Sequence, residues 1–238
     1  MKYSIIIPCY NERDNVDDLI SRIKPLQEQY DLEYVLVENG SKDGSREYFN
    51  KNIENRYPGI QVVYVDMNQG YGYGLQQGMK AAEGDYVGWI HADLQIPPEI
   101  LRKFFDEIEK HPTHEKLFLK GRRKNRRALD RFFTNGQSMF NTLLFKTPIY
   151  DVGAIPVLFS RSLLNKVSID DMANDFSIEL YIYKEAKRLG YEIERIKVEL
   201  LSREKGNSSW NHGLKSKIRQ SRRIFKDSLK IKRGEKVL

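Results

Sequence analysis

The chain has 238 residues, of which 40% are hydrophobic and 31% are charged, and its formal net charge is +7. This composition supports a sizeable core in one large domain, and it excludes a membrane-spanning helix because no apolar run approaches roughly 20 residues. The single cysteine, Cys9, excludes an internal disulfide, argues together with the four histidines against a structural zinc site, and favours a reducing, cytoplasmic location.

Strand-like and helix-like segments alternate through the first half of the chain. Short apolar or β-branched runs predict strands at residues 3–8, 33–38, 61–65 and 85–90. The first run is too short for a signal peptide and is predicted to be a buried strand. Helix-like spacing and helix start signals predict helices at residues 14–30, 43–55, 72–83 and 98–110. This alternation predicts an α/β fold with a mostly parallel sheet, helices on both faces, and ligands at the carboxyl ends of the strands.

Polar segments, two of them with glycine, follow the four predicted strands. They are residues 8–12 (PCYNE), 38–45 (ENGSKDGS), 68–74 (NQGYGYG) and 91–95 (HADLQ). Tyr10 and Glu12 suit contacts to a base or a ribose, and Glu38 or Asn39 suits the polar edge of a base. The glycines permit close backbone approach, and the amides around Gly70 could face an anion. Each segment taken alone also fits an ordinary turn or a helix cap.

The segment after the fourth predicted strand holds candidate metal ligands. In an extended chain, residues two apart point the same way, so we expect His91, Asp93 and Gln95 to converge. Carboxylate and amide oxygens suit Mg²⁺ or Mn²⁺, and an imidazole favours Mn²⁺. Such an ion would bridge the two phosphates of a nucleotide-sugar and stabilise the departing diphosphate. The alternative interpretation is a buried strand end with a helix-capping aspartate.

The second half of the chain is less regular. Helices are predicted at residues 128–145 and 175–189, and strands at residues 154–159 and 192–200. A basic amphipathic helix is predicted at residues 211–238, after one domain at residues 1–210. Its apolar stripe is Leu214, Ile218, Phe225 and Leu229. This stripe would serve equally for entering the headgroup region of an anionic membrane and for packing on the domain.

Basic residues are concentrated in two runs. Residues 120–131 hold seven Lys or Arg against one acid, and residues 214–236 hold ten against two. One such run often marks only a solvated face. Two runs indicate an anionic partner, which could be phosphate groups, an anionic membrane surface or nucleic acid.

Taken together and in their order, the segments resemble glycosyltransferase family 2, and most closely the branch with dolichol-phosphate mannose synthase and related bacterial enzymes. The family's P-x-Y-N-E, D-D-G-S-x-D-G-T and N-x-G-x-G motifs resemble residues 8–12, 38–45 and 68–72. Its A-x-G-D-Y and D-A-D-L-Q-x-P-P-E motifs resemble residues 82–86 and 91–99. Weaker counterparts of its G-S-R and R-x-x-G-x-S motifs lie at residues 120–122 and 203–208.

This resemblance implies a nucleotide-diphospho-sugar transferase (GT-A) fold, with residues 1–210 as the catalytic domain, and a sugar transfer that inverts the anomeric centre. It would assign the nucleotide-sugar to Pro8, Tyr10, Glu12, Glu38, Asn39, Gly70, Asp93, Arg131 and Arg203. It would assign Mn²⁺ or Mg²⁺ and the diphosphate to His91, Asp93 and Gln95, and a phosphate contact to Arg122. Two departures matter. The family's paired aspartates are Glu38 and Asn39 here, which leaves the base open, and His91 replaces an aspartate, which removes a negative charge.

An inverting transfer to a hydroxyl needs a general base near the acceptor. Asp175 is the first candidate and Glu179 the second, because a helix would place both on one face. The alternative is that Asp175 caps the helix and Glu179 is solvated. A lipid phosphate acceptor is already a nucleophile, and in that case Arg122 and Arg131 would orient the phosphate.

We therefore expect a metal-dependent glycosyltransferase acting on a membrane-associated acceptor, a polyprenyl phosphate or a lipid-linked glycan as in cell-surface polysaccharide synthesis. It would work in the cytoplasm at the inner face of the membrane, without a nucleic-acid partner. One alternative is a sugar nucleotidyltransferase, but residues 11–14 (NERD) replace the glycine-rich basic loop expected there. A basic nucleic-acid-binding protein would explain the charge runs and leave the strand-end segments without a role.

Overall fold

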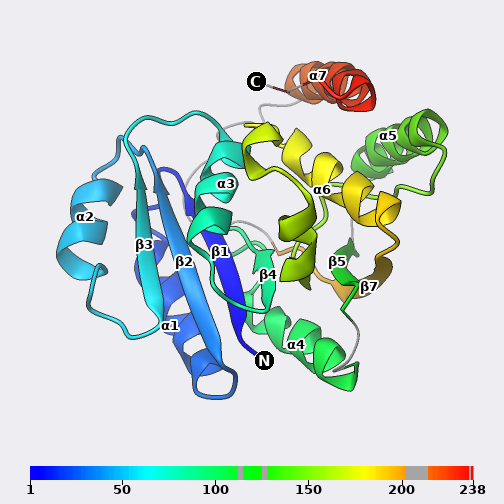
Figure 1. Ribbon diagram of the computed structural model, residues 1–238. Helices are drawn as coiled ribbons and strands as arrows, with labels where there is room; N and C mark the ends of the chain where they lie inside the picture. Colours follow the sequence, from blue (N-terminus) through cyan, green and yellow to red (C-terminus); the bar gives the residue numbers. More distant parts are fainter. Residues whose placement is uncertain (112–114, 125–127, 202–213, 236, 238) are drawn as a thin grey trace.

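The computed structural model describes residues 1–238 except 112–114, 125–127, 202–213, 236 and 238. Within this part of the chain, one seven-stranded sheet has the order β3-β2-β1-β4-β6-β5-β7 (Figure 1). The strands are β1 (Tyr3–Cys9), β2 (Leu32–Asn39), β3 (Ile60–Val65), β4 (Tyr86–Trp89), β5 (Leu117–Arg123), β6 (Val157–Ser160) and β7 (Glu192–Val198). Only β6 runs against its two neighbours, so the other described strands end at the same edge of the sheet.

Helices cover both faces of this sheet. They are α1 (Val16–Gln27), α2 (Ser45–Asn52), α3 (Tyr71–Ala81), α4 (Leu101–Lys110), α5 (Ala128–Phe145), α6 (Ser177–Arg188) and α7 (Leu214–Arg233). Three short 3₁₀ helices are η1 (Pro98–Ile100), η2 (Arg161–Lys166) and η3 (Ile169–Asp171). The core is formed where these helices meet the Ile- and Val-rich strands β1 and β2.

The two helices that flank β1 and β2 show how the layers are fixed. In α3, a Cβ on Gly78 would lie 2.3 Å from Cγ2 of Ile6, so glycine is what lets this helix approach the sheet. On the other face, the hydroxyl of Tyr34 donates to the carbonyl of Ile23 in α1 at 3.2 Å. Successive strand residues alternate between the two faces of the sheet. The contacts of Ile6 with α3 and of Tyr34 with α1 therefore place these two helices on opposite sides.

The predicted elements of the first half agree with the structure. Strands β1–β4 and helices α1–α4 fall at the predicted positions, with ends that differ by a few residues. In the second half, α5 has the predicted bounds, whereas β5 was not among the predicted elements. The sequence of β5, LFLKGRR, ends in charged residues and glycine as a loop would, but Lys120 is fully buried there. A hydrophobic pattern does not predict a strand that contains a buried lysine.

The C-terminal helix α7 packs against α5 and α6 (Figure 1). Of its predicted apolar stripe, Phe225 packs on Phe140 of α5 with ring centroids 4.7 Å apart, whereas Ile218 and Leu229 are 38% and 40% exposed. The buried residues of α7 among those described include Asp227, Ser228 and Ile231. Buried polar groups hold this face: the hydroxyl of Ser177 donates to the carboxylate of Asp227 at 3.1 Å. The side chain of Leu214 lies outside the described residues, and the division of the chain at residue 210 stays a prediction.

No helix among the described residues combines the length and the apolar character that crossing a bilayer requires.

Candidate functional site

The loops after β1 and β2 lie side by side at the carboxyl edge of the sheet. The register pairs Cys9 with Glu38, so both strands end at the same level. The amide of Asn11 donates to the hydroxyl of Ser41 at 3.0 Å, and the amide of Lys42 donates to the side-chain oxygen of Asn11 at 2.8 Å. These reciprocal bonds join two loops that are 30 residues apart in the chain.

Glu38 and Asn39 end β2 as buried polar residues. One carboxylate oxygen of Glu38 accepts the amide of Ser41 at 2.7 Å, and the other accepts no hydrogen bond, although Arg46 Nη1 lies 3.7 Å away. The side-chain amide of Asn39 donates to the carbonyl of Gly70 at 3.1 Å, while its oxygen accepts none from the described residues. Buried acceptors without donors are unusual and indicate a place where a ligand's donors are expected.

The three predicted nucleoside contacts from β1 lie around the same edge. Pro8, Tyr10 and Glu12 are each partly exposed. Glu12 also has a structural role, because its carboxylate accepts the side-chain amide of Asn15 at the start of α1. The structure therefore brings these residues next to the β2 loop, while their contacts to a nucleoside stay a prediction.

The glycine-rich loop before α3 packs against the segment that leads into α6. Gly70 has a φ of +119°, and a Cβ there would lie 2.2 Å from the carbonyl oxygen of Asn174. The amide of Gly70 donates to the side-chain oxygen of Asn68 at 3.0 Å, and the amide of Tyr73 donates to Asn174 at 3.1 Å. Close approach of the two segments is thus a structural reason for the glycine, and these two amides already donate within the protein.

The segment after β4 turns instead of continuing as a strand. β4 ends at Trp89, residues 92–93 form a turn, and Leu94 has a φ of +57°. The alternation argument for His91, Asp93 and Gln95 is therefore wrong in its geometry. The carboxylate of Asp93 accepts the amide of Gln95 at 3.2 Å, and the Gln95 side chain donates to the carbonyl of Leu201 at 3.4 Å. Convergence of the three side chains on one ion stays a prediction.

A buried hydrogen-bond relay fixes the imidazole of His91. The Tyr71 hydroxyl donates to Glu179 at 3.2 Å, and Nε2 of His91 lies 3.2 Å from the same hydroxyl. Burial beside the Glu179 carboxylate raises the pKa of the Tyr71 phenol well above its usual range, so the phenol keeps its proton. Because that one proton points at Glu179, Nε2–H of His91 must donate to the tyrosine oxygen. In neutral His91 the lone pair is then on Nδ1, which suits a divalent cation.

Neither candidate base is arranged as the sequence suggested. The helix α6 begins at Ser177, so Asp175 precedes it and does not share a helical face with Glu179. The carboxylate of Asp175 accepts the amide of Ser177 at 2.8 Å and pairs with Nε of Arg223 at 2.7 Å. Glu179 is 3% exposed, not solvated, and accepts a hydrogen bond from the Tyr71 hydroxyl. Asp175 thus accepts the first helical amide from the position before the N-cap residue Phe176, and its role as a general base stays a prediction.

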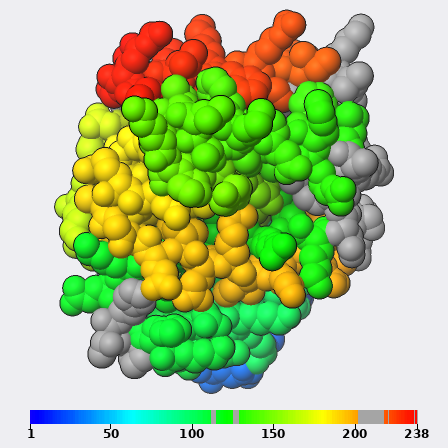
Figure 2. Space-filling model, turned by 90° about the vertical axis from the view of Figure 1, so that its right-hand side faces the viewer, coloured from blue at the N-terminus to red at the C-terminus, as the bar shows by residue number. Residues whose placement is uncertain are grey.

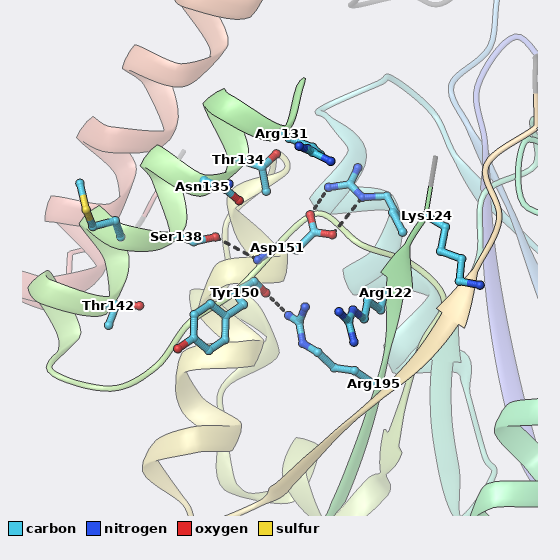
Figure 3. A pocket seen from close by; sticks show the side chains of 12 residues that line it. Arg122, Lys124, Arg131, Thr134, Asn135, Ser138, Thr142, Tyr150, Asp151 and Arg195 are labelled. Atoms are coloured by element: carbon cyan, nitrogen blue, oxygen red, sulfur yellow. Dashed lines mark hydrogen bonds and ion pairs between the residues drawn. The ribbon is translucent and has the colours of Figure 1, made fainter. Parts of the chain in front are cut away.

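A strongly cationic cavity of about 750 Å³ opens between β5, α5 and β7 (Figure 3). Five of the side chains around it are cations and one is an acid. The lining residues are Arg122, Arg123, Lys124, Arg131, Thr134, Asn135, Ser138, Met139, Thr142, Tyr150, Asp151 and Arg195. Arg123 pairs with Asp151, and the amide of Asp151 donates to the Ser138 hydroxyl at 3.0 Å, which ties the cavity floor to α5. The remaining positive charge makes this an anion site in chemical terms.

The cavity contains two of the predicted phosphate contacts, Arg122 and Arg131, from separate elements. The third, Arg203, lies outside the described residues. The sequence analysis missed Arg195 and Asp151. The basic run at residues 120–131 indicated the region, but no local signal marks Arg195, whose guanidinium reaches the carbonyl of Tyr150 across the cavity.

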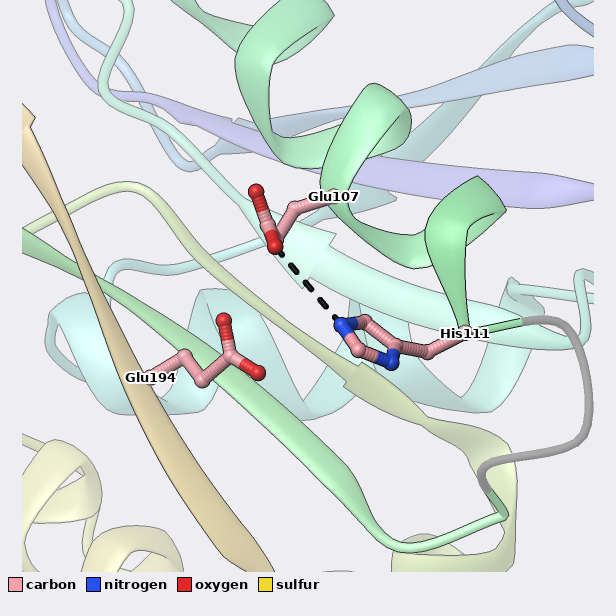
Figure 4. Close-up of side chains that lie close together, drawn as sticks. All are labelled: Glu107, His111 and Glu194. Carbon is pink, nitrogen blue, oxygen red and sulfur yellow. Dashed lines mark ion pairs between the residues drawn. The ribbon is translucent and has the colours of Figure 1, made fainter.

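A different cluster has metal-ligating side chains within reach of one another. Among the described residues, one group of three such side chains is Glu107, His111 and Glu194, with His111 Nε2 at 3.7 Å from the Glu107 carboxylate (Figure 4). Glu194 is near the start of β7, so the cluster lies at the edge of the sheet opposite the loops described above. It is therefore separate from the predicted metal site.

Comparison with solved structures identifies the fold. Glucosyl-3-phosphoglycerate synthase from Mycobacterium tuberculosis, in complex with Mn²⁺, uridine diphosphate and phosphoglyceric acid, matches with a TM-score of 0.72. The match covers 98% of this chain and 79% of that one, at 19% sequence identity. The uridine-diphosphate complex without the metal matches with a TM-score of 0.70. This likeness confirms the predicted GT-A fold.

Many curated relatives match in sequence, and two of them illustrate the similarity. The dolichol-phosphate mannosyltransferase of Pyrococcus furiosus is 36% identical over 109 residues, which is 46% of this chain and 30% of the relative. The undecaprenyl-phosphate 4-deoxy-4-formamido-L-arabinose transferase of Proteus mirabilis is 28% identical over 221 residues, 88% of this chain and 63% of the relative. The chain thus spans less than two thirds of the length of either relative.

The model of the family described as glycosyl transferase family 2 matches residues 4–166, which hold the loops after β1, β2, β3 and β4 and two sides of the cationic cavity. The resemblance expected from the strand-end motifs is confirmed, and the chain belongs to glycosyl transferase family 2.

Proposed function

We propose that this chain transfers a sugar, with inversion, from a nucleotide-sugar to the phosphate of a polyprenyl-phosphate acceptor at a membrane surface. The observation that carries the proposal is the pairing of two sites. A carboxyl edge with unsatisfied buried oxygens at Glu38 and Asn39 lies on one side, and a cavity with excess positive charge lies on the other. A lipid-linked glycan is the other acceptor class predicted from the sequence.

The donor would bind at the carboxyl edge. Pro8, Tyr10 and Glu12 would contact the nucleoside from the β1 loop. The oxygens of Glu38 and Asn39 that accept no hydrogen bond would accept its polar hydrogens. Joined loops support this role, because a rigid edge loses little conformational freedom when a ligand binds. Gly70 would act indirectly, because it lets the loop before α3 pack against the Asn174 carbonyl and so holds that loop in place.

A divalent cation, Mn²⁺ or Mg²⁺, would be held by His91 Nδ1, the Asp93 carboxylate and the Gln95 side-chain oxygen. The donor set fits, because the relay through Tyr71 leaves the ring nitrogen with a lone pair available in the neutral imidazole. The ion would supply positive charge to the diphosphate as it leaves. Solved complexes of the M. tuberculosis synthase with Mn²⁺ and uridine diphosphate support this assignment.

The transfer itself requires little proton chemistry if the acceptor is a phosphate. An acceptor oxygen forms the new bond to the anomeric carbon on the face opposite the diphosphate, and the electron pair of the broken bond leaves with the diphosphate. An ionised phosphate oxygen needs no general base, which agrees with the engagement of Asp175 by Ser177 and Arg223. Arg122 and Arg131 would hold the non-reacting oxygens and orient the nucleophile.

The names of the curated relatives support this acceptor class. One is named for dolichol phosphate and the other for undecaprenyl phosphate. A peripheral position at the inner face of the membrane would give the enzyme access to such a lipid and to donor from the cytoplasm. Cell-surface polysaccharide synthesis is the process that such a product would serve.

A two-stage experiment tests the proposal. Calorimetric titration with UDP, GDP, CDP and dTDP, with and without Mn²⁺, should show one nucleotide that binds more tightly with the ion. A labelled sugar donor with that base is then supplied with a short polyprenyl phosphate in detergent, and the label should move into the organic phase. No binding of any nucleotide would contradict the donor site. Label on a water-soluble phosphate alone would replace the proposed lipid acceptor with a soluble one.

A further inference from the structure

The outer face of α5 is apolar and open to solvent. Leu129, Phe132, Met139 and Leu143 lie on one side of this helix and are between 48% and 73% exposed. Their spacing of three, seven and four residues keeps them on one stripe of an α-helix. Gly136 lies in the middle of the stripe, and a Cβ there would meet nothing within 4 Å. Single exposed apolar side chains are ordinary, but a stripe along a whole helix marks an interaction surface.

The stripe borders the cationic cavity. Met139 belongs to the stripe and also lines the cavity, while Arg131 and Asn135 line the cavity from the adjacent side of the same helix. A third side of α5 faces the protein, where Phe140 meets Phe225 of α7 with ring centroids 4.7 Å apart. In Figure 2 α5 forms a ridge on the face shown, with α7 beside it. A bilayer surface that meets the stripe would therefore also meet the cavity.

Positive charge frames this stripe. Exposed Arg219, Arg222 and Lys226 extend from α7, which packs against α5, and Arg122 and Lys124 extend from β5 on the cavity side. An apolar stripe with Lys and Arg at its margins is the composition of helices that lie in the headgroup region of anionic membranes. A protein partner of ordinary composition would not need cations on both margins.

We propose that the outer face of α5 inserts into the headgroup region of an anionic bilayer and thereby brings the cationic cavity to the level of the lipid phosphates. This inference rests on the proposed function, because it names the surface from which that site takes its acceptor. It also moves the membrane contact expected from the sequence: α7 contributes charge at the margin, and α5 contributes the apolar side chains.

The test compares two exposed apolar surfaces of the same chain, the stripe on α5 and the loop before α3. Phe132 and Leu143 are both more than 70% exposed and do not line the cavity, so Phe132→Gln with Leu143→Gln removes apolar area while keeping a helix-forming residue. Met67, which is 74% exposed in the loop before α3, provides the matched control Met67→Gln. Binding is measured by flotation with vesicles of phosphatidylcholine and phosphatidylglycerol, and with phosphatidylcholine alone.

We expect the wild type and Met67→Gln to float with the anionic vesicles, and the α5 double variant to bind them roughly 30-fold more weakly because two apolar side chains no longer insert. Circular dichroism should show equal helix content in all three. Equal flotation of the double variant, or no flotation of the wild type, would overturn the proposal. A wild-type dimer that the double variant converts to monomer would overturn it in favour of a subunit interface.

Two further measurements separate this inference from the proposed function. Nucleoside diphosphate binding, measured without lipid, should be the same in wild type and double variant. Transfer to acceptor dissolved in detergent should also be unchanged, whereas transfer to acceptor embedded in anionic vesicles should fall. If transfer fails for the wild type in detergent as well, the proposed function is wrong, whatever the vesicles show.

Discussion

The carboxyl edge of strands β1, β2 and β4 and the cavity under α5 are built for ligands in contrasting ways. At the edge, Glu38 and Asn39 are buried, and hydrogen bonds between loops hold each group in place. In the cavity, five cations surround Asp151, and the walls come from helix and strand segments far apart in sequence. The edge can select a ligand by hydrogen-bond pattern, whereas the cavity selects mainly by charge. A donor of defined structure suits the first, and a phosphate on a variable chain suits the second.

The largest effect is expected from removing a predicted metal ligand at the carboxyl edge, which leaves the cavity unchanged. Asp93→Ala should lower turnover by on the order of a thousandfold, because the leaving diphosphate loses its bound charge compensation. It should also abolish the Mn²⁺-dependent gain in nucleotide affinity. Initial rates and calorimetry measure both, with Asp31→Ala as an exposed control far from the edge. Near-normal turnover of Asp93→Ala would refute its role.

The burial of Lys120 in β5 can be tested through the pH dependence of the free energy of unfolding. Burial lowers the pKa of its ammonium group from 10.5 to about 8, only partly opposed by the nearby carboxylate of Glu179. Between pH 8 and pH 10.5 the unfolded chain therefore holds more protons at this residue than the folded chain, and folding becomes more favourable as pH rises. The free energy of unfolding of the wild type, relative to Lys120→Met, should rise by about 3 kcal/mol across that window.

Urea denaturation of both proteins at several pH values measures this difference, and the comparison removes the contribution of the tyrosines that both share. A difference that stays constant with pH would mean that Lys120 is not buried as the structure has it. A difference that falls with pH would mean that its ammonium form is favoured in the fold, and the cavity would then have a sixth strong cation beneath it.

The cavity itself is tested through its arginines. Arg122→Ala and Arg131→Ala should each raise the KM for a phosphate acceptor about tenfold to a hundredfold, since each removes a charge-assisted hydrogen bond. Nucleotide affinity should not change, because both residues line the cationic cavity and not the loops after β1 and β2. Steady-state kinetics with varied acceptor measures the effect, and Arg56→Ala is the exposed control. Weakened nucleotide binding with unchanged KM for the acceptor would reassign both arginines to the donor.

The smallest expected effect concerns the relay that fixes His91. Tyr71→Phe keeps the ring that stacks on Phe176 at 4.8 Å but removes the hydroxyl between His91 and Glu179. Freed from that partner, the imidazole can take either tautomer, and Mn²⁺ affinity should fall about tenfold. Electron paramagnetic resonance of unbound Mn²⁺ measures this directly, with Tyr73→Phe as the matched control. Unchanged affinity in Tyr71→Phe would show that His91 does not hold the ion.

The same contrast decides what could be predicted from the sequence. Strands β1–β4 and the helices between them follow from local periodicity, and the polar segments after them marked the carboxyl edge correctly. Predictions from local sequence were wrong where a short segment does not have the regular strand or helix geometry that was assumed. Leu94 turns the chain after β4, and α6 begins at Ser177, two residues too late for Asp175 to share its face with Glu179.

The cavity could be predicted only in part, for a physical reason. The basic run at residues 120–131 predicted its positive charge. Its shape depends on the pairing of β5 with β7, and β5 was not predicted because it buries Lys120. Arg195 faces the cavity only through that pairing, and nothing in the residues around it indicates the contact. The exposed stripe of α5 was contained in a correctly predicted helix, yet amphipathic spacing alone does not say which side meets the protein.

A crystal grown with Mn²⁺ and the nucleoside diphosphate selected by calorimetry tests the central claim most directly, through the anomalous scattering of manganese. We predict a peak beside Nδ1 of His91 and the carboxylate of Asp93, with the nucleoside between the β1 and β2 loops. A manganese peak found only at Glu107, His111 and Glu194, with no nucleotide at the carboxyl edge, would contradict the account.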